Sequence, residues 1–315
     1  MNFFSSKKSC FHDKCTFQQS YTEGSTIQGY ELEDIVWPGT SNIEQSTKIF
    51  MQLAVPMTFG CESRETGLIA SQFADGIMGL SWKQDNIVSK MYQAGSLPYN
   101  AFSICLTKSD GFLSFGGTSA SLVSHKDDNT NNSKVDDNKF LLGMKNKKPR
   151  HLEKMKMVPI SKNFGYYSID IKDFRLGGIS ITSKLSIKSI FNGGTGTIID
   201  SGTSDTYLPK RIEKDFNRVW YQLTKQKKLT NSLQQYTDTE FERLPNITFI
   251  LEGGHEWTIQ PSEYMEEAKR DKGFYNRIYL DEPKGAVLGA NAIINHDILF
   301  DMNNRVIGIA RAECS

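Results

Sequence analysis

Short apolar runs, separated by turns that contain glycine, recur along most of this 315-residue chain. Residues 10–36 alternate between apolar and polar positions around Glu23-Gly24-Ser25, a pattern that predicts a β-hairpin. Two more short strands are predicted over 101–106 and 111–117, and residues 166–171 alternate with the same period of two. We therefore expect β-strands to be the main elements of the chain.

Two segments show helical spacing instead. Residues 86–94 carry apolar side chains on one face and are followed by Gly95, which suits a short amphipathic helix ended by glycine. Pro209 opens a second helix, predicted over 210–224. The apolar face of that second helix consists of Ile212, Phe216, Val219, Trp220 and Leu223.

Residues 118–150 differ from their surroundings in composition. They are rich in Asp, Asn and Lys and contain few residues that form cores. Such a segment buries too little apolar area to offset the entropy lost on ordering. We expect a flexible polar insertion, whose lysine cluster is more simply explained by solvation than by an acidic partner.

Charge and composition exclude several classes of protein. The 37 basic and 36 acidic residues leave a net charge of +1, which argues against nucleic-acid binding. No apolar run approaches the ~18 residues of a membrane-spanning helix, and residues 1–8 lack the pattern of a signal peptide. No Cys or His group has zinc spacing, so no metal is expected. Asn131-Asn132-Ser133 and Asn246-Ile247-Thr248 are glycosylation acceptors only if the chain is secreted.

The stretch 197–204 carries the clearest chemical signal. An apolar run leads to Asp200, and Gly202 then permits a tight turn. The carboxylate is thereby placed at a strand end, where the hydroxyls of Thr203 and Ser204 can donate to it and fix its orientation. The D-S-G triplet alone is common by chance, and an ordinary strand-to-turn aspartate explains it as well.

The flanking residues change this interpretation. Asp200-Ser201-Gly202-Thr203, followed by Tyr207-Leu208-Pro209, resembles the second active-site segment of pepsin-like aspartic proteases. The resemblance implies that Asp200 is one of two catalytic carboxylates and that Ser201 clasps the loop of the other lobe. It also implies that Thr203 bonds the outer oxygen of Asp200, while Gly202 and Ser204 complete the supporting loop.

Other motifs of the family follow in family order along nearly all of the chain outside 118–150. Tyr21-Thr22-Glu23-Gly24-Ser25 resembles the flap that covers bound substrate, with Tyr21, Thr22 and Gly24 as its substrate-binding residues. Asp75-Gly76-Ile77-Met78-Gly79-Leu80 resembles a segment beneath the first catalytic loop, where Ile77, Met78 and Leu80 are expected in the core and Asp75 is structural. The last signature, Val287-Leu288-Gly289-Ala290 followed by Asp297–Asp301 and Arg305–Ala310, includes Asp301 as a turn residue of the final hairpin.

The resemblance implies an all-β, bilobal, pepsin-like acid protease fold with a few short helices and an incomplete first lobe. The expected parts are a partial N-terminal lobe over 1–117, the insertion 118–150 and a C-terminal lobe over 151–315. It further implies a monomeric aspartic endopeptidase that acts on polypeptides without a cofactor or metal. Its compartment would be the secretory pathway, a lysosome or vacuole, or the exterior.

The cysteines are expected to form disulfides in such a compartment. The five residues are Cys10, Cys15, Cys61, Cys105 and Cys314, and an odd count leaves one without a partner inside the chain. Cys61 and Cys105 resemble cysteines of the plant and protist branches of the family. We expect the pairs Cys10–Cys15 and Cys61–Cys105, although spacing alone does not fix the connectivity.

The sequence departs from the family pattern in two respects. It contains a single D-[ST]-G, since Asp75-Gly76 and Asp110-Gly111 lack the intervening hydroxyl residue. It also carries Asp205 where relatives have an apolar residue. Three hypotheses remain: an endopeptidase whose first half-site lies in an upstream segment, an inactive homologue that binds peptides, or an unrelated β-rich binding protein. The ordered motifs argue against the third, and the presence of both Asp200 and Tyr21 favours the first over the second.

Overall fold

The computed structural model describes residues 5–314 except 12–13, 22, 40–52, 73, 84, 119–139, 144–149, 152, 163–164, 183, 226–228 and 269–271. Its contacts divide the chain into Met1–Leu97 and Pro98–Ser315, called unit 1 and unit 2 below and described separately. Strands predominate in both units and the helices are short, so the expected all-β class is confirmed.

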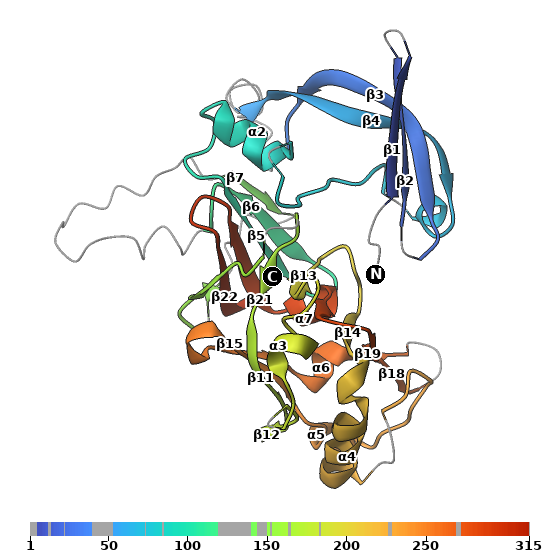
Figure 1. The fold of residues 1–315 in the computed structure, drawn as a ribbon, viewed down its shortest axis with the longest axis vertical. Coiled ribbons are helices and arrows are strands. Elements are labelled where there is room, and N and C mark those ends of the chain that lie inside the picture. Colours follow the sequence, from blue (N-terminus) through green and yellow to red (C-terminus); the bar gives the residue numbers. More distant parts are fainter. Residues whose placement is uncertain are drawn as a thin grey trace, which may run out of the picture. The chain divides into compact units, whose positions relative to one another are not determined.

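Unit 1 is built on one antiparallel sheet in the order β1-β2-β3-β4 (Figure 1). Its strands are β1 (Ser5–Phe11), β2 (Lys14–Ser20), β3 (Thr26–Val36) and β4 (Val55–Thr66). The pair β2–β3 is the predicted hairpin. Its turn is closed by the Tyr21 N–H, which donates to the Ser25 carbonyl at 2.9 Å, and Gly24 supplies the positive φ of 97° that this turn requires.

The predicted helix of unit 1 is present as α2 (Ile87–Gln93), which follows the single-turn 3-10 helix η2 (Ile69–Ser71). The side chain of Asn86 caps α2 by accepting a hydrogen bond from the Ser89 N–H at 2.9 Å. Ile87, Val88 and Met91 are buried and contribute to the core of the unit. The amphipathic pattern and the cap together explain why this stretch is helical.

One expectation for unit 1 is wrong. Ile77 and Met78 were expected in the core, yet they are 52% and 49% exposed, and Leu80 is half-buried. Residues 74–80 belong to no strand or helix, and a Cβ at Gly76 or Gly79 would meet no other atom within 4 Å. The apolar sequence is suited to a core, but no described residue covers these two side chains.

The described part of unit 2 contains four sheets. The first has the order β10-β13-β20-β14-β19, from β10 (Ser168–Ile169), β13 (Thr197–Ile199), β14 (Thr206–Pro209), β19 (Ile278–Glu282) and β20 (Ala286–Leu288). The second has the order β12-β11-β15-β16, from β11 (Ile171–Leu176), β12 (Ile179–Ser180), β15 (Ile247–Leu251) and β16 (Glu256–Ile259). A two-stranded sheet joins β17 (Met265–Glu267) to β18 (Phe274–Asn276).

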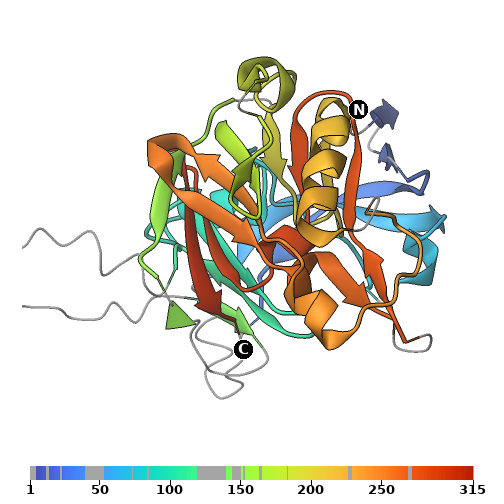
Figure 2. The ribbon, with the colours of Figure 1, turned by 90° about the horizontal axis from the view of Figure 1, so that it is seen from below.

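The longest helix of unit 2 is α4, which is prominent in Figure 2. The helical elements are α3 (Ile187–Ile190), η3 (Lys210–Ile212), α4 (Glu213–Thr224), α5 (Asp238–Glu242), η4 (Glu252–Gly254), α6 (Pro261–Tyr264) and α7 (Ala290–Ile293). The helix predicted over 210–224 is thus confirmed as η3 followed by α4. Phe216 and Trp220 of α4 are fully buried and join Phe174 of β11 in an aromatic core.

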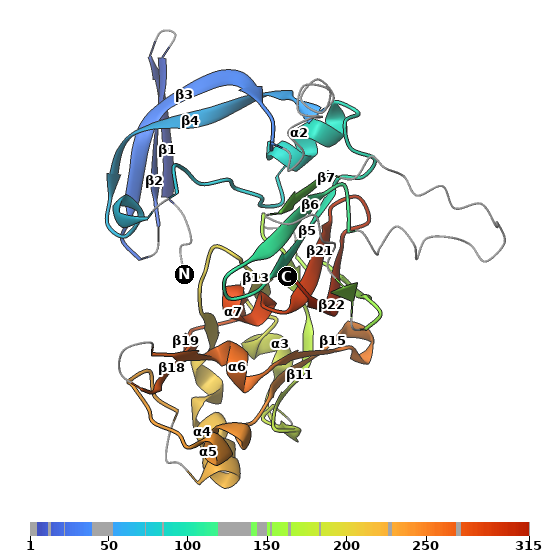
Figure 3. The same cartoon turned by 180° about the vertical axis from the view of Figure 1, so that it is seen from behind.

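The fourth sheet of unit 2 brings together strands from distant parts of the chain, seen side by side in Figures 1 and 3. Its order is β7-β6-β5-β21-β22-β8, with β9 also paired to β22. The strands are β5 (Ala101–Leu106), β6 (Gly111–Phe115), β7 (Phe140–Gly143), β8 (Arg150–His151), β9 (Lys156–Pro159), β21 (His296–Asp301) and β22 (Val306–Glu313). Two strands expected with the first lobe, β5 and β6, therefore pair within unit 2, and β7 and β8 use residues from the expected insertion. The rest of that insertion lies largely outside the described residues.

This sheet corrects one of the two expected disulfides. Cys10–Cys15 is present, but Cys105 is bonded to Cys314 and not to Cys61. Pairing of β5 with β21 and of β21 with β22 brings the end of β22 beside Cys105. Cys61 lies on β4 opposite Tyr30 as an exposed free thiol.

Within the described part of the chain, no helix is both long and apolar enough to cross a membrane.

Candidate functional site

The position of Asp200 follows from the burial of β13. All three residues of β13 are buried, and the strand lies between β10 and β20. Where β13 ends, the Asp200 N–H donates to the Leu288 carbonyl of β20 at 3.0 Å. The chain then turns, and the side chain of Asp200 remains only half-buried. A rigid strand thus delivers a carboxylate to the margin of the sheet.

Both oxygens of the Asp200 carboxylate accept hydrogen bonds from its own turn. The Thr203 hydroxyl donates to Oδ2 at 2.7 Å, and the Gly202 N–H donates to Oδ1 at 3.0 Å. The Thr203 N–H also donates to the Asp200 carbonyl at 3.2 Å, which closes the turn. Charge-assisted bonds of this kind fix the plane of a carboxylate. Ser201 is exposed beside it.

The start of α7, preceded by Gly289, holds the turn through backbone hydrogen bonds. The Ala290 N–H donates to the Thr203 carbonyl at 2.7 Å, and the Asn291 N–H donates to the Ser204 carbonyl at 3.2 Å. Gly289 permits this approach, because a Cβ there would lie 2.1 Å from the Asp205 carbonyl oxygen and 2.6 Å from that of Thr203. The Val-Leu-Gly-Ala motif recognised in the sequence therefore supports the Asp200 turn through its backbone.

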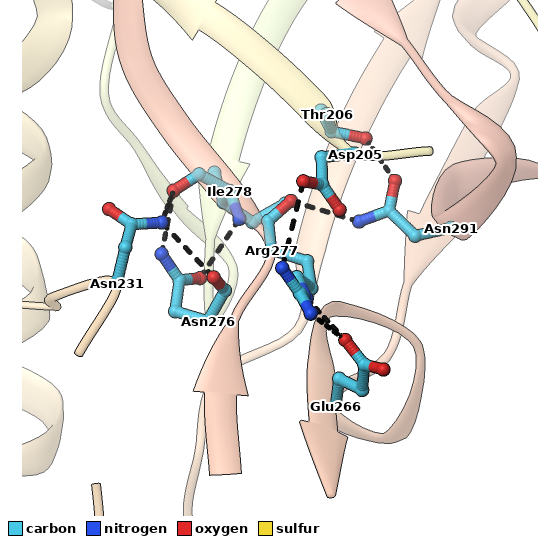
Figure 4. Close-up of polar contacts among 8 residues, drawn as sticks. All are labelled: Asp205, Thr206, Asn231, Glu266, Asn276, Arg277, Ile278 and Asn291. Carbon is cyan, nitrogen blue, oxygen red and sulfur yellow. Dashed lines mark hydrogen bonds and ion pairs between the residues drawn. The ribbon is translucent and has the colours of Figure 1, made fainter. Parts of the chain in front are cut away.

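Asp205, the departure noted in the sequence, lies in the charged cluster drawn in Figure 4. Its Oδ2 lies 3.9 Å from Nη1 of Arg277, whose guanidinium also binds Glu266. Burial raises the pKa of Asp205, and the charge of Glu266 raises it further. The charge of Arg277 and a hydrogen bond from Tyr279 lower this pKa, but their combined effect is smaller. The net result is a raised pKa for Asp205.

The same cluster ties β14 to the segment before β19 through hydrogen bonds (Figure 4). The Thr206 hydroxyl donates to Oδ1 of Asn291 at 2.7 Å, and Nδ2 of Asn291 donates to the Arg277 carbonyl at 3.1 Å. The Thr206 N–H donates to the same carbonyl at 3.1 Å. Asn291 is buried, and these bonds fix the start of β14 directly after Asp205.

Tyr166 was not predicted as a site residue. Its pKa is raised first by burial and then by the negative charge of Asp200, so its hydroxyl lies within the electrostatic reach of that carboxylate. The neighbouring backbone explains the proximity, because the Tyr167 carbonyl accepts from the Ile199 N–H at 2.9 Å. In the sequence, Tyr166-Tyr167 indicated only a strand. The feature that identifies Tyr166 as a neighbour of Asp200 is the pairing of β10 with β13, which only the structure gives.

The predicted flap residues belong to unit 1, whereas Asp200 belongs to unit 2. Tyr21 is half-buried, and its pKa is raised by burial and then by the charges of Glu62 and Glu23. Gly24 forms the exposed turn, and Thr22 lies outside the described residues. The buried Ser25 anchors this turn, since its hydroxyl accepts from the Leu68 N–H at 3.0 Å.

Two protein-family models and several known proteins match this chain. Residues 129–312 match the model of the eukaryotic aspartyl protease family, and residues 2–117 match the xylanase inhibitor N-terminal model. Aspartic proteinase 36 of Arabidopsis thaliana is 25% identical over 333 residues, which cover 100% of this chain and 60% of that protein.

Two further relatives show the same pattern. Plasmepsin V of Plasmodium falciparum is 23% identical over 372 residues, covering 97% of this chain and 59% of the relative. Aspartic proteinase 39 of Arabidopsis thaliana is 24% identical over 315 residues, covering 96% of this chain and 58% of the relative. The chain thus spans about three fifths of the length of these relatives. The family match and the relatives agree with the motifs read from the sequence: the chain belongs to the eukaryotic aspartyl protease family, in its plant and protist type.

Proposed function

We propose that the complete protein is an aspartic endopeptidase in which Asp200 is one of the two catalytic carboxylates. One observation carries this proposal: Asp200 ends a fully buried strand, and both of its oxygens accept hydrogen bonds, from Thr203 and Gly202. Family membership supports the same chemistry. The second carboxylate would come from a D-[ST]-G turn outside residues 1–315, because this sequence contains only one such triplet.

Peptide hydrolysis by this class of enzyme needs two carboxylates that share one proton across a bound water. The ionised carboxylate accepts a proton from the water, whose oxygen attacks the carbonyl carbon of the substrate. The protonated carboxyl donates to the carbonyl oxygen, and the resulting tetrahedral intermediate then releases the amine. The hydrogen bonds from Thr203 and Gly202 would hold Asp200 in plane for this proton transfer without a large cost of reorganisation.

The neighbouring residues have supporting roles in this proposal. Ser201 would clasp the loop of the other carboxylate, and Ser204 would continue the supporting turn through its carbonyl. Tyr21, Thr22 and Gly24 would form the flap over the bound peptide. The exposed turn at Gly24 and its anchor at Ser25 suit a hairpin tip of this kind.

The working environment follows from the chemistry. One carboxyl of the dyad must stay protonated, so the enzyme should work best in acid and prefer apolar residues beside the scissile bond. We place it in the secretory pathway, in a lysosome-like or vacuole-like compartment or outside the cell, because the disulfides Cys10–Cys15 and Cys105–Cys314 suit an oxidising compartment. It would act as a monomer on polypeptides, without a cofactor and without nucleic acid.

A second candidate is an inactive homologue that binds peptides. The observation that favours it is the single D-[ST]-G in residues 1–315. An isolated aspartate has no partner with which to share a proton, so a protein that lacks the second turn throughout its length would bind peptides without cleaving them.

The test uses the full-length protein and a quenched peptide substrate, with pepstatin as the inhibitor control. Asp200→Asn should abolish pepstatin-sensitive cleavage and leave the melting temperature near that of the wild type. Asp75→Asn, the same change at the exposed aspartate of the Asp75-Gly76 pair, should retain full activity. Undiminished cleavage by Asp200→Asn would remove this residue from the mechanism. A full-length wild type that binds peptides but does not cleave them would support the second candidate.

A further inference from the structure

Asn246 lies at a well-defined surface position in unit 2. It immediately precedes β15, and its side chain is exposed although Pro245 and Ile247 on either side are buried. The Asn246 carbonyl accepts a hydrogen bond from the Gly177 N–H at 2.8 Å. The backbone is therefore fixed, while the side-chain amide faces solvent.

The surroundings of Asn246 leave room for a bulky substituent. The segment paired with it is the turn Gly177-Gly178, in which both residues have a positive φ, 55° and 81°. A Cβ at Gly178 would meet no other atom within 4 Å, whereas one at Gly177 would lie 2.7 Å from Cδ1 of Leu223. The turn is therefore open at Gly178, and neither glycine places a side chain of its own beside the asparagine.

The hydroxyl at the second position after Asn246 is also present. Thr248 completes the Asn-X-Thr triplet, with Ile247 rather than proline between them. In the folded chain its Oγ1 lies 3.1 Å from Oγ1 of Thr258, its register partner on β16. This contact gives Thr248 a structural role that can be separated experimentally from its role in the triplet.

We infer that Asn246 carries an N-linked oligosaccharide. The donor would be a lipid-diphosphate-linked oligosaccharide: Nδ2 of Asn246 forms a bond to the anomeric carbon, the bond from that carbon to the diphosphate oxygen breaks, and the amide loses one proton. The inference rests on the secretory location within the proposed function, which the two disulfides support independently of the catalytic assignment.

The glycan leaves the Asp200 turn accessible. Asn246 is hydrogen-bonded to Gly177, just past the end of β11, whereas the start of β11 at Ile171 directly follows β10, the strand that pairs with β13. Five residues of strand separate these two ends, which is about 17 Å at 3.3 Å per residue. Figure 1 shows β12, at the far end of β11, well away from β13. The attachment point is thus remote from the site proposed for catalysis.

The experiment is a tryptic peptide map of the full-length protein isolated from its own cells. One sample is treated in heavy-oxygen water with an enzyme that removes N-linked glycans, and a second sample is kept in the same water without the enzyme. Trypsin releases Leu244–Lys269, in which Asn246 is the single asparagine. Removal of a glycan converts that asparagine to aspartate carrying heavy oxygen. We expect this mass shift in the peptide, and its absence when the enzyme is omitted.

Matched variants separate modification from folding. Asn246→Gln and Thr248→Ala should lose the glycan, whereas Thr248→Ser should keep it. Thr258→Ala removes the same hydroxyl contact without altering the triplet and should also keep the glycan. An unmodified Leu244–Lys269 peptide from protein that has both disulfides and cleaves peptides would overturn the inference and leave the proposed function intact. A glycosylated protein without peptidase activity would support the inference and contradict the proposed catalytic function.

Discussion

The disulfide between Cys105 and Cys314 offers a quantitative test of the fold of unit 2. Its two cysteines are 209 residues apart, and both are buried, beside Phe112 and Ala312. For a loop of this length, the chain-entropy relation gives a stabilisation of about 5 kcal/mol at 25 °C. Because native disulfides contribute roughly 2–5 kcal/mol in practice, we expect the paired change Cys105→Ala and Cys314→Ala to cost about 4 kcal/mol.

The assay is thermal unfolding of the full-length protein, followed by near-ultraviolet circular dichroism. In a unit of this size, 1 kcal/mol shifts the melting temperature by about 2–4 °C, so the double variant should melt roughly 8–16 °C below the wild type. Cys61→Ala is the matched control, because Cys61 is exposed and free. Its effect should stay within about 0.5 kcal/mol.

The opposite result would refute this reasoning. If Cys61→Ala destabilised the protein as much as the double variant, Cys105 would be paired with Cys61, as first expected from the sequence. A tryptic map without reductant gives an independent measure, since Met91–Lys108 should be joined to the peptide that begins at Ala312 and contains Cys314. A map in which these two peptides run separately would contradict the structure.

Three further predictions concern unit 2. Burial alone raises the pKa of Asp173, but hydrogen bonds from neighbouring donors outweigh it and lower the pKa below the ordinary 3.8. Its stabilisation is therefore complete above that pH and lost below it, so Asp173→Ala should cost about 1–3 kcal/mol in neutral urea titrations and less near pH 3. Arg277→Gln removes the cation between Asp205 and Glu266, and the pKa of Asp205 is already raised. The variant should lose about 1–2 kcal/mol of unfolding free energy at pH 7, and less in acid, where Asp205 is protonated. Gly289→Ala forces a Cβ against backbone oxygens and should cost about 1–3 kcal/mol and reduce kcat, whereas Gly79→Ala, in open space, should change neither.

The elements that the sequence predicted correctly are those specified by local patterns. The hairpin β2–β3 depends on alternation and a glycine turn, and α4 depends on helical spacing after Pro209. In each case residues close in sequence supply both the pattern and its start or stop signal. The motif around Asp200 was recognisable for the same reason, because its hydrogen bonds come from residues two and three positions away.

The expectations that were wrong depend on partners far away in the chain. Cys105 meets Cys314 because β5 pairs with β21 and β21 with β22, a register that no short pattern contains. The apolar residues Ile77 and Met78 suit a core, but burial also requires neighbours to cover them. The proximity of Tyr166 to Asp200 likewise depends on the pairing of β10 with β13. The local sequence pattern indicates which side chains are suited to burial, whereas the order of the strands determines which residues they contact.

This distinction explains how the Asp200 turn accommodates Asp205. The bonds that hold the turn run mainly between backbone groups of 200–204 and of 288–291, so they depend on the order β13-β20-β14 and on the lack of a side chain at Gly289. Because these hydrogen bonds involve backbone groups, they allow an unusual side chain next to the turn, provided that this side chain has hydrogen-bond or ion-pair partners of its own. Arg277 supplies the opposite charge, so a carboxylate in place of an apolar residue adds a pH-sensitive contact without displacing Asp200. The Asp205 carboxylate therefore depends on Arg277 for its opposite charge, while the geometry of the Asp200 turn depends on Gly289.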